Sequence, residues 1–127
     1  MAETNIHSRF TEAKFYPRTD TPSWDFELGD LTTDGTWRDL DLSSIVPEGA
    51  RYVFLAGRIR DEDAVGSEFG VRKNGDTGID VRKETSLAAL DHWFYIGVSC
   101  DENRVIEYYA ANVTWTRIEF RIQGWLK

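Results

Sequence analysis

Residues 104–127, RVIEYYAANVTWTRIEFRIQGWLK, decide the fold class of this chain. Within them, segment 117–123 alternates strictly, with isoleucine and phenylalanine on one face and charged or amide side chains on the other. A period of two residues is typical of a half-buried strand. Segment 104–110 is short and rich in Val, Ile and Tyr, which predicts a second strand. We interpret residues 111–113 as a hairpin loop that joins these two strands as partners.

Turn signals divide the preceding sequence into further short strands. We expect strands at 37–42, 51–60, 69–73, 79–83 and 92–100. Asn74-Gly75-Asp76 predicts a β-hairpin between the third and fourth of these, whereas segment 86–91 fits either a helical turn or a loop. Roughly seven or eight strands without a long helix predict an all-β fold, an antiparallel β-sandwich of jelly-roll-like order.

Residues 1–24 differ from the rest of the chain because they are polar, contain two prolines and show no sustained period of two. Phe10, Phe15 and Tyr16 nevertheless lie among them. One interpretation is a frayed terminus. The other is an extended arm that places its aromatic side chains on a neighbouring subunit, since disordered tails carry few aromatics. We therefore divide the chain into an N-terminal arm, 1–24, and a β-sandwich domain, 25–127.

Composition narrows the class of partner. The chain has 127 residues, enough for one domain with its own core, and a formal net charge of −7. An acidic chain without clustered Lys and Arg argues against binding to nucleic acid. The sequence lacks an apolar run of membrane-spanning length and a signal-peptide core, so we expect no membrane partner and synthesis in a cytoplasm.

Motifs for catalysis or metal binding are not evident. His7 and His92 are far apart, and Cys100 alternates with apolar residues, which predicts a buried thiol that takes no part in catalysis. We interpret the acidic segments 61–63 and 101–103 as solvated turns, with a calcium site as the alternative. We therefore expect no enzymatic activity, no cofactor and no metal.

Aromatic side chains are the remaining signal. Tyr52, Phe54, Trp93 and Tyr95 fall on the strand faces opposite the aliphatic residues. If these faces are exposed, they form a subunit interface, where Tyr, Trp and Phe are enriched. They could instead stack on sugar rings beside carboxylates such as Asp61 or Asp101. The third interpretation is that both faces are core.

The segments GTWRDLDLSSIVPEGARYVFLAGRI at 35–59, VRKNGD at 71–76 and 102–127 resemble small β-sandwich domains of tailed-phage and prophage structural proteins. The shared features are Gly35-Thr36-Trp37, the turn around Pro47 and Gly49, Tyr108-Tyr109, and Gly124-Trp125 near the end. In longer phage proteins such modules sit at the tips of tail or head fibres. Here the module makes up nearly the whole chain, which favours a stand-alone part of the virion.

The resemblance implies a non-enzymatic virion protein, first of all a capsid decoration (cement) protein. Such a protein would be made in the host cytoplasm, form a homo-oligomer, with a trimer as the first expectation, and bind the major capsid protein or another virion protein. The alternative is a receptor- or carbohydrate-binding module of a fibre, with a surface glycan as partner. The residues expected at the subunit or capsid interface are Phe10, Phe15, Tyr16, Tyr52, Phe54, Trp93 and Tyr95.

Overall fold

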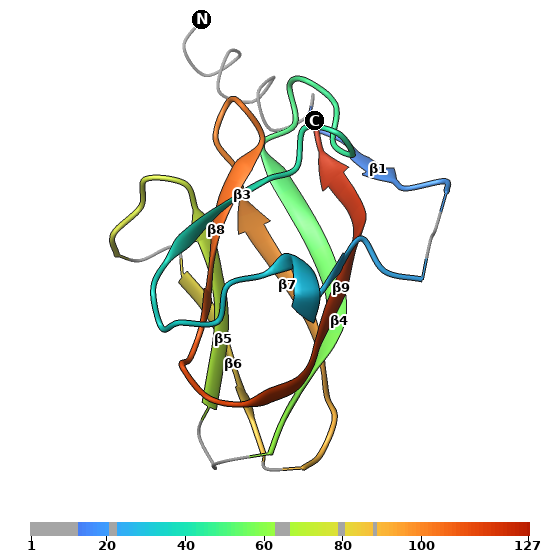
Figure 1. Cartoon of the computed structure of the whole chain (residues 1–127). Helices are drawn as coiled ribbons and strands as arrows, with labels where there is room; N and C mark the ends of the chain where they lie inside the picture. The colour runs from blue at the N-terminus through green and yellow to red at the C-terminus, as the bar shows by residue number, and fades with distance from the viewer. Residues whose placement is uncertain (1–12, 21–22, 63–66, 79–80, 88) are drawn as a thin grey trace, which may run out of the picture.

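The computed structural model describes residues 13–20, 23–62, 67–78, 81–87 and 89–127 (Figure 1). These residues form nine strands and one short 3-10 turn. The elements are β1 (Phe15–Pro17), β2 (Phe26–Glu27), η1 (Leu28–Asp30), β3 (Arg38–Asp41), β4 (Tyr52–Asp61), β5 (Ser67–Lys73), β6 (Val81–Ser86), β7 (His92–Ser99), β8 (Val105–Ala110) and β9 (Trp115–Leu126).

Two antiparallel sheets pack against each other, which confirms the predicted β-sandwich. Sheet A has the order β1-β9-β4-β7, with β2 also paired to β9, and sheet B has the order β3-β8-β5-β6. From β3 onward the chain changes sheet at every connection except that between β5 and β6. This alternation is the jelly-roll order that the turn-bounded strands led us to expect.

The prediction that the last two strands form a hairpin is wrong. β8 lies in sheet B between β3 and β5, whereas β9 lies in sheet A between β1 and β4. The chain crosses from one sheet to the other, and the buried Trp115 donates a hydrogen bond from Nε1 to the carbonyl of Ala111 across this corner (2.9 Å). Alternation along a strand does not indicate which strand it pairs with. The sequence pattern therefore fits a hairpin and a crossover between the two sheets equally well.

The predicted β5–β6 hairpin is confirmed. Arg72 pairs with Val81, and Gly75 has a φ of 88°, a left-handed conformation that glycine adopts without strain. Of the predicted fourth strand, 79–83, residues 79 and 80 lie outside the described residues, and β6 extends to Ser86. The described residues of 87–91 form no helix.

The core lies between the sheets and takes one face from each long strand. On β4 the inward residues Val53, Leu55 and Ile59 are almost completely buried. Phe69 of sheet B packs with Phe94 and Phe120 of sheet A, with both ring centroids at 5.7 Å. Further buried residues include Leu40, Leu42, Ile106, Ile118 and Ile122.

Gly57 explains how β4 and β9 approach so closely in the core. A Cβ built on Gly57 would lie 2.1 Å from the carbonyl oxygen of Glu119 and 2.6 Å from Cβ of Phe120. No side chain fits at that separation, so only glycine leaves room for Phe120, its partner on β9.

The described part of the predicted arm lies on its own chain. β1 pairs with the end of β9, with Phe15 opposite Leu126 and Pro17 opposite Gly124. In Figure 1 this short strand lies beside the C-terminal end of β9. Residues 1–12, which include Phe10, lie outside the described residues, so the predicted contact of Phe10 with a neighbouring subunit stays a prediction.

Candidate interaction face

The outer side of sheet A carries a group of aromatic side chains that we call the aromatic face. Its members are Phe15 on β1, Trp24 just before β2, Tyr52 and Phe54 on β4, and Trp93 and Tyr95 on β7. In the sheet, Phe54 pairs with Gly97, and Ala56 pairs with Tyr95. Antiparallel partners point to the same side, so these aromatic rings lie opposite the core.

The exposure of this face is high for side chains of this type. Tyr95 is 79% exposed, Trp93 57% and Phe15 51%. Tyr52 and Phe54 are half-buried, and Ala56 is buried. Within the described residues no second layer covers Trp93 or Tyr95, so the interpretation that both faces of β4 and β7 are core finds no support in that part of the chain.

Two glycines lie beneath the rings of Tyr52 and Phe15. We call this pair, Gly97 and Gly124, the glycine floor. A Cβ on Gly97 would lie 2.6 Å from the Tyr52 ring, and a Cβ on Gly124 would lie 2.7 Å from the Phe15 ring. Both rings therefore lie close to backbone that has no side chain of its own. Phe54 then makes edge contacts with Phe15 and Tyr52 at centroid distances of 5.4 and 5.3 Å, which holds the three rings in fixed positions.

Tyr95 separates two shallow hollows in this face. Phe15, Phe54, Tyr95, Gly97 and Gln123 line the first hollow. Trp24, Trp93, Tyr95 and Arg121 line the second hollow. Because Tyr95 lines both, its exposed ring stands as a ridge between two depressions.

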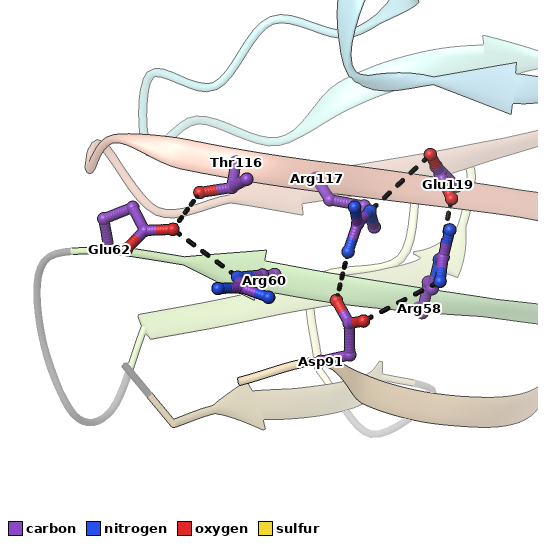
Figure 2. A network of polar contacts seen from close by, with 7 residues as sticks. All are labelled: Arg58, Arg60, Glu62, Asp91, Thr116, Arg117 and Glu119. Atoms are coloured by element: carbon purple, nitrogen blue, oxygen red, sulfur yellow. Dashed lines mark hydrogen bonds and ion pairs between the residues drawn. The ribbon is translucent and has the colours of Figure 1, made fainter. Parts of the chain in front are cut away.

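A network of ion pairs occupies the other end of the same face (Figure 2). Nε of Arg58 donates to Glu119 at 2.8 Å, and Asp91 accepts from Nη1 of Arg117 at 2.5 Å. The guanidinium of Arg58 also lies over the rings of Trp24 and Trp93, at 5.7 and 5.1 Å. Arg58 thereby joins the charged end to the aromatic end, and its contacts restrict both Trp rings.

A buried ion pair fixes the segment between β1 and β2 to β9. The side chains of Arg18 and Asp25 are 8% and 6% exposed, and Nη1 of Arg18 donates to Oδ2 of Asp25. That oxygen also accepts the backbone N–H of Ile122 at 2.8 Å, and the N–H of Arg18 donates to the carbonyl of Gln123 at 2.9 Å. The Asp25 carboxylate raises the pKa of the Arg18 guanidinium.

This ion pair lies between the two short strands that pair with β9. β1 pairs with residues 124–126 of β9 and β2 with residues 119–120. Arg18 and Asp25 bind backbone groups in the interval between them, so the pair continues the edge of sheet A with side chains. It also holds Trp24 in place over the aromatic face.

The predicted interface residues fall into three groups. Phe15, Tyr52, Phe54 and Tyr95 lie together, and Trp93 lies on the far side of Tyr95 with Trp24. Tyr16 alternates with Phe15 and pairs with Trp125, so it points away from the aromatic face, although it is 43% exposed. Phe10 is outside the described residues.

Trp24, Arg121 and the glycine floor are not evident from the sequence. Trp24 belongs to the predicted arm, and only the pairing of its neighbours with β9 brings it over the sheet. Gly97 and Gly124 are visible in the sequence as glycines inside strands, a pattern that signals close approach of another group.

The carboxylates expected beside the rings for sugar binding lie elsewhere. Asp61 is completely buried at the end of β4. Asp101 accepts hydrogen bonds from the Asn74 amide and from the backbone N–H groups of Asn103 and Val105, each at 2.9 Å. Neither residue lines the two hollows.

The outer side of sheet B offers a contrast. Arg72 lies 4.1 Å from the centre of the Trp37 ring and donates to Glu107 at 2.5 Å. Trp37 also contacts Tyr109, with centroids 5.5 Å apart. The side chains of Arg72 and Glu107 are 16% and 13% exposed, so the groups on this side already satisfy one another.

Other kinds of site find little support in the described residues. They contain no cluster of three or more His, Cys, Asp or Glu side chains placed to hold a metal ion, and no helix long and apolar enough to cross a membrane. Cys100 is buried, as predicted, and burial raises the pKa of its thiol. Neither a protein-family model nor a curated protein nor a solved structure matches this chain.

Proposed function

We propose that this chain is a non-enzymatic structural protein of a tailed-phage virion, a capsid decoration protein that self-associates through the aromatic face and binds the capsid surface. One observation carries the proposal: Trp93 and Tyr95, 57% and 79% exposed, stand on the outer side of a regular sheet. Exposed aromatic clusters of this kind are typical of protein interfaces.

The fold is compatible with this role without deciding it. Jelly rolls occur in viral capsid proteins and in lectins. Because one fold hosts many functions, the aromatic face and the sequence resemblance to phage structural domains support this role more than the fold does. The formal net charge of −7 suits a protein on the outer surface of a capsid, away from packaged DNA.

The mechanism is burial of the aromatic face between subunits, with the second contact made to the major capsid protein or another virion protein. Tyr52 and Phe54 are held in place by Phe15 and the glycine floor, so few rotamers are lost on association. A trimer is the expected assembly, as the resemblance implies.

The decisive experiment is the solution mass by light scattering after size-exclusion chromatography, for the wild type and for the double variant Trp93→Ser/Tyr95→Ser. We expect an oligomer for the wild type and a monomer for the variant. Co-sedimentation with capsids that lack the protein would then test capsid binding. A wild type that is monomeric at all concentrations and does not bind such capsids would refute the proposal.

Carbohydrate binding is the second candidate, and the second hollow favours it. Trp24, Trp93 and Tyr95 surround that hollow, with Arg121 and Ser23 as hydrogen-bonding groups at its border. Aromatic rings with a few polar groups are common in ligand sites. A glycan array with signals that Trp93→Ser abolishes would support this function, and an array without signals would exclude it.

A further inference from the structure

The ridge and the first hollow of the aromatic face lie side by side. Tyr95 projects from β7 and is 79% exposed. Beside it, Phe15, Phe54 and Gln123 border a hollow, with Gly97, which has no side chain, in its lining. A surface that carries a projection next to a depression can be complementary to a copy of itself.

Charge also distinguishes this face from the rest of the chain. The described residues on and around it include four arginines, Arg58, Arg60, Arg117 and Arg121, and four carboxylates, Glu27, Glu62, Asp91 and Glu119. The whole chain has 15 basic and 22 acidic residues. The acidic excess therefore lies outside this set, so contact through these residues adds no net like charge between two acidic chains.

Arg121 adds a third observation. It lines the second hollow beside Tyr95, and within the part of the chain that the structure describes it has no ion-pair partner. Its neighbours along the face, Arg58 and Arg117, are both paired. A guanidinium beside aromatic rings readily stacks on a further ring.

We infer that the occupant of the first hollow is Tyr95 of a second copy of this chain. The inference rests on the proposed self-association and names its central contact. Tyr95 of one copy enters the hollow between Phe15 and Phe54 of its neighbour, over Gly97. Because the projection and the hollow are adjacent, the contact is reciprocal when two copies face each other. Used in one direction only, it forms a ring when the rotation between copies closes.

A complementation experiment tests this contact. Tyr95→Ala removes the projection and one wall of the first hollow but keeps the border formed by Phe15, Phe54 and Gln123. Gln123→Trp fills the hollow and leaves the projection. We expect each variant alone to self-associate at least about 30-fold more weakly than the wild type, as for a central interface residue. An equimolar mixture should form a 1:1 complex more tightly than either variant associates with itself, as measured by sedimentation velocity.

A second comparison covers the case in which Gln123→Trp fails to fold. Tyr95→Asp and Leu90→Asp each place a carboxylate at a large apolar side chain that is exposed, at 79% and 58%. Leu90 lies in the β6–β7 loop and lines neither hollow. We expect Tyr95→Asp to be monomeric and Leu90→Asp to associate like the wild type.

The outcomes separate this inference from the proposed function. A wild type that is oligomeric and unaffected by either Tyr95 variant would overturn the inference alone. The same holds for a mixture no tighter than its components. A monomeric wild type whose capsid binding is lost in Tyr95→Asp would overturn the inference, because Tyr95 would then contact a capsid protein and not a second copy of this chain. A wild type that neither associates nor binds capsids would refute both proposals.

Discussion

Loss of the Asp25 carboxylate should destabilise the fold far more than loss of a second carboxylate that contacts the same arginine. Arg18 contacts Asp25, which is 6% exposed, and Asp20, which is 86% exposed and lies 3.3 Å from Nε of Arg18. Asp25→Ala leaves the guanidinium of Arg18 buried without its main partner and removes the acceptor of the Ile122 N–H. Asp20→Ala removes only a contact at the surface.

The magnitudes follow from burial. Removal of one member of a buried ion pair typically costs about 3–5 kcal/mol, because the remaining charge is no longer compensated. The unpaired N–H of Ile122 contributes to the same loss, at about 1–3 kcal/mol for an unsatisfied buried donor. We therefore expect Asp25→Ala to lower the free energy of unfolding by about 4 kcal/mol. A domain of this size has about 5–15 kcal/mol in total.

The free energy of unfolding of the wild type and both variants can be measured by urea unfolding, followed by tryptophan fluorescence. Asp20→Ala, the matched control, should change the free energy of unfolding by less than about 1 kcal/mol, as expected for an exposed pair. The double variant Arg18→Met/Asp25→Ala should be more stable than Asp25→Ala, because it no longer buries an unpaired charge. Equal losses for Asp25→Ala and Asp20→Ala would refute the argument that burial of this pair fixes the arm to β9.

Three further predictions concern the core, a loop and the aromatic face. Gly57→Ala should lower the free energy of unfolding by at least about 3 kcal/mol, because the new Cβ would lie 2.1 Å from the carbonyl oxygen of Glu119. Gly29→Ala is the control, because a Cβ there has open space around it. A Gly57→Ala variant with wild-type stability would contradict the packing described for β4 and β9. Burial acts to raise the pKa of Asp101, but hydrogen bonds, first that from the Asn74 amide, hold this pKa below its ordinary value. The carboxylate therefore stabilises the fold at pH values above the ordinary pKa, and this effect is lost as the pH falls through the lowered pKa. The stability difference between wild type and Asp101→Asn should therefore shrink below about pH 4 in urea titrations, and a constant difference would contradict this. Phe15→Ser should lower the free energy of unfolding by only about 1 kcal/mol, because the ring is half-exposed. It should nevertheless weaken self-association, as measured by sedimentation velocity. Unchanged association would show that Phe15 is not part of the interface.

Strand periodicity made the fold class predictable, but not the pairing of strands. Alternation along β4, β7 and β9 identified the inward residues correctly, because side-chain direction in a strand is set by the local backbone. The hairpin expected between β8 and β9 was wrong, since the same alternation fits a neighbour in either sheet. Gly35, Gly49 and Gly75 have positive φ, a conformation that glycine adopts readily in turns.

The candidate site was predictable in part. Tyr52, Phe54, Trp93 and Tyr95 were recognised as a set, because they share a strand face opposite the core. The contribution of Trp24 and the burial of Arg18 with Asp25 were not predicted. These residues lie in a polar segment with no periodicity, and their environment exists only once that segment pairs with β9.

By itself, the sequence determined that the chain forms alternating strands, which side of each strand enters a core, and where glycine permits a turn. These properties depend on the backbone geometry of a few neighbouring residues. Tertiary structure alone decided which strands pair, which outward aromatic residues stay exposed, and which charged groups are buried. Those properties depend on what packs against a surface from distant parts of the chain, and no local pattern contains that information.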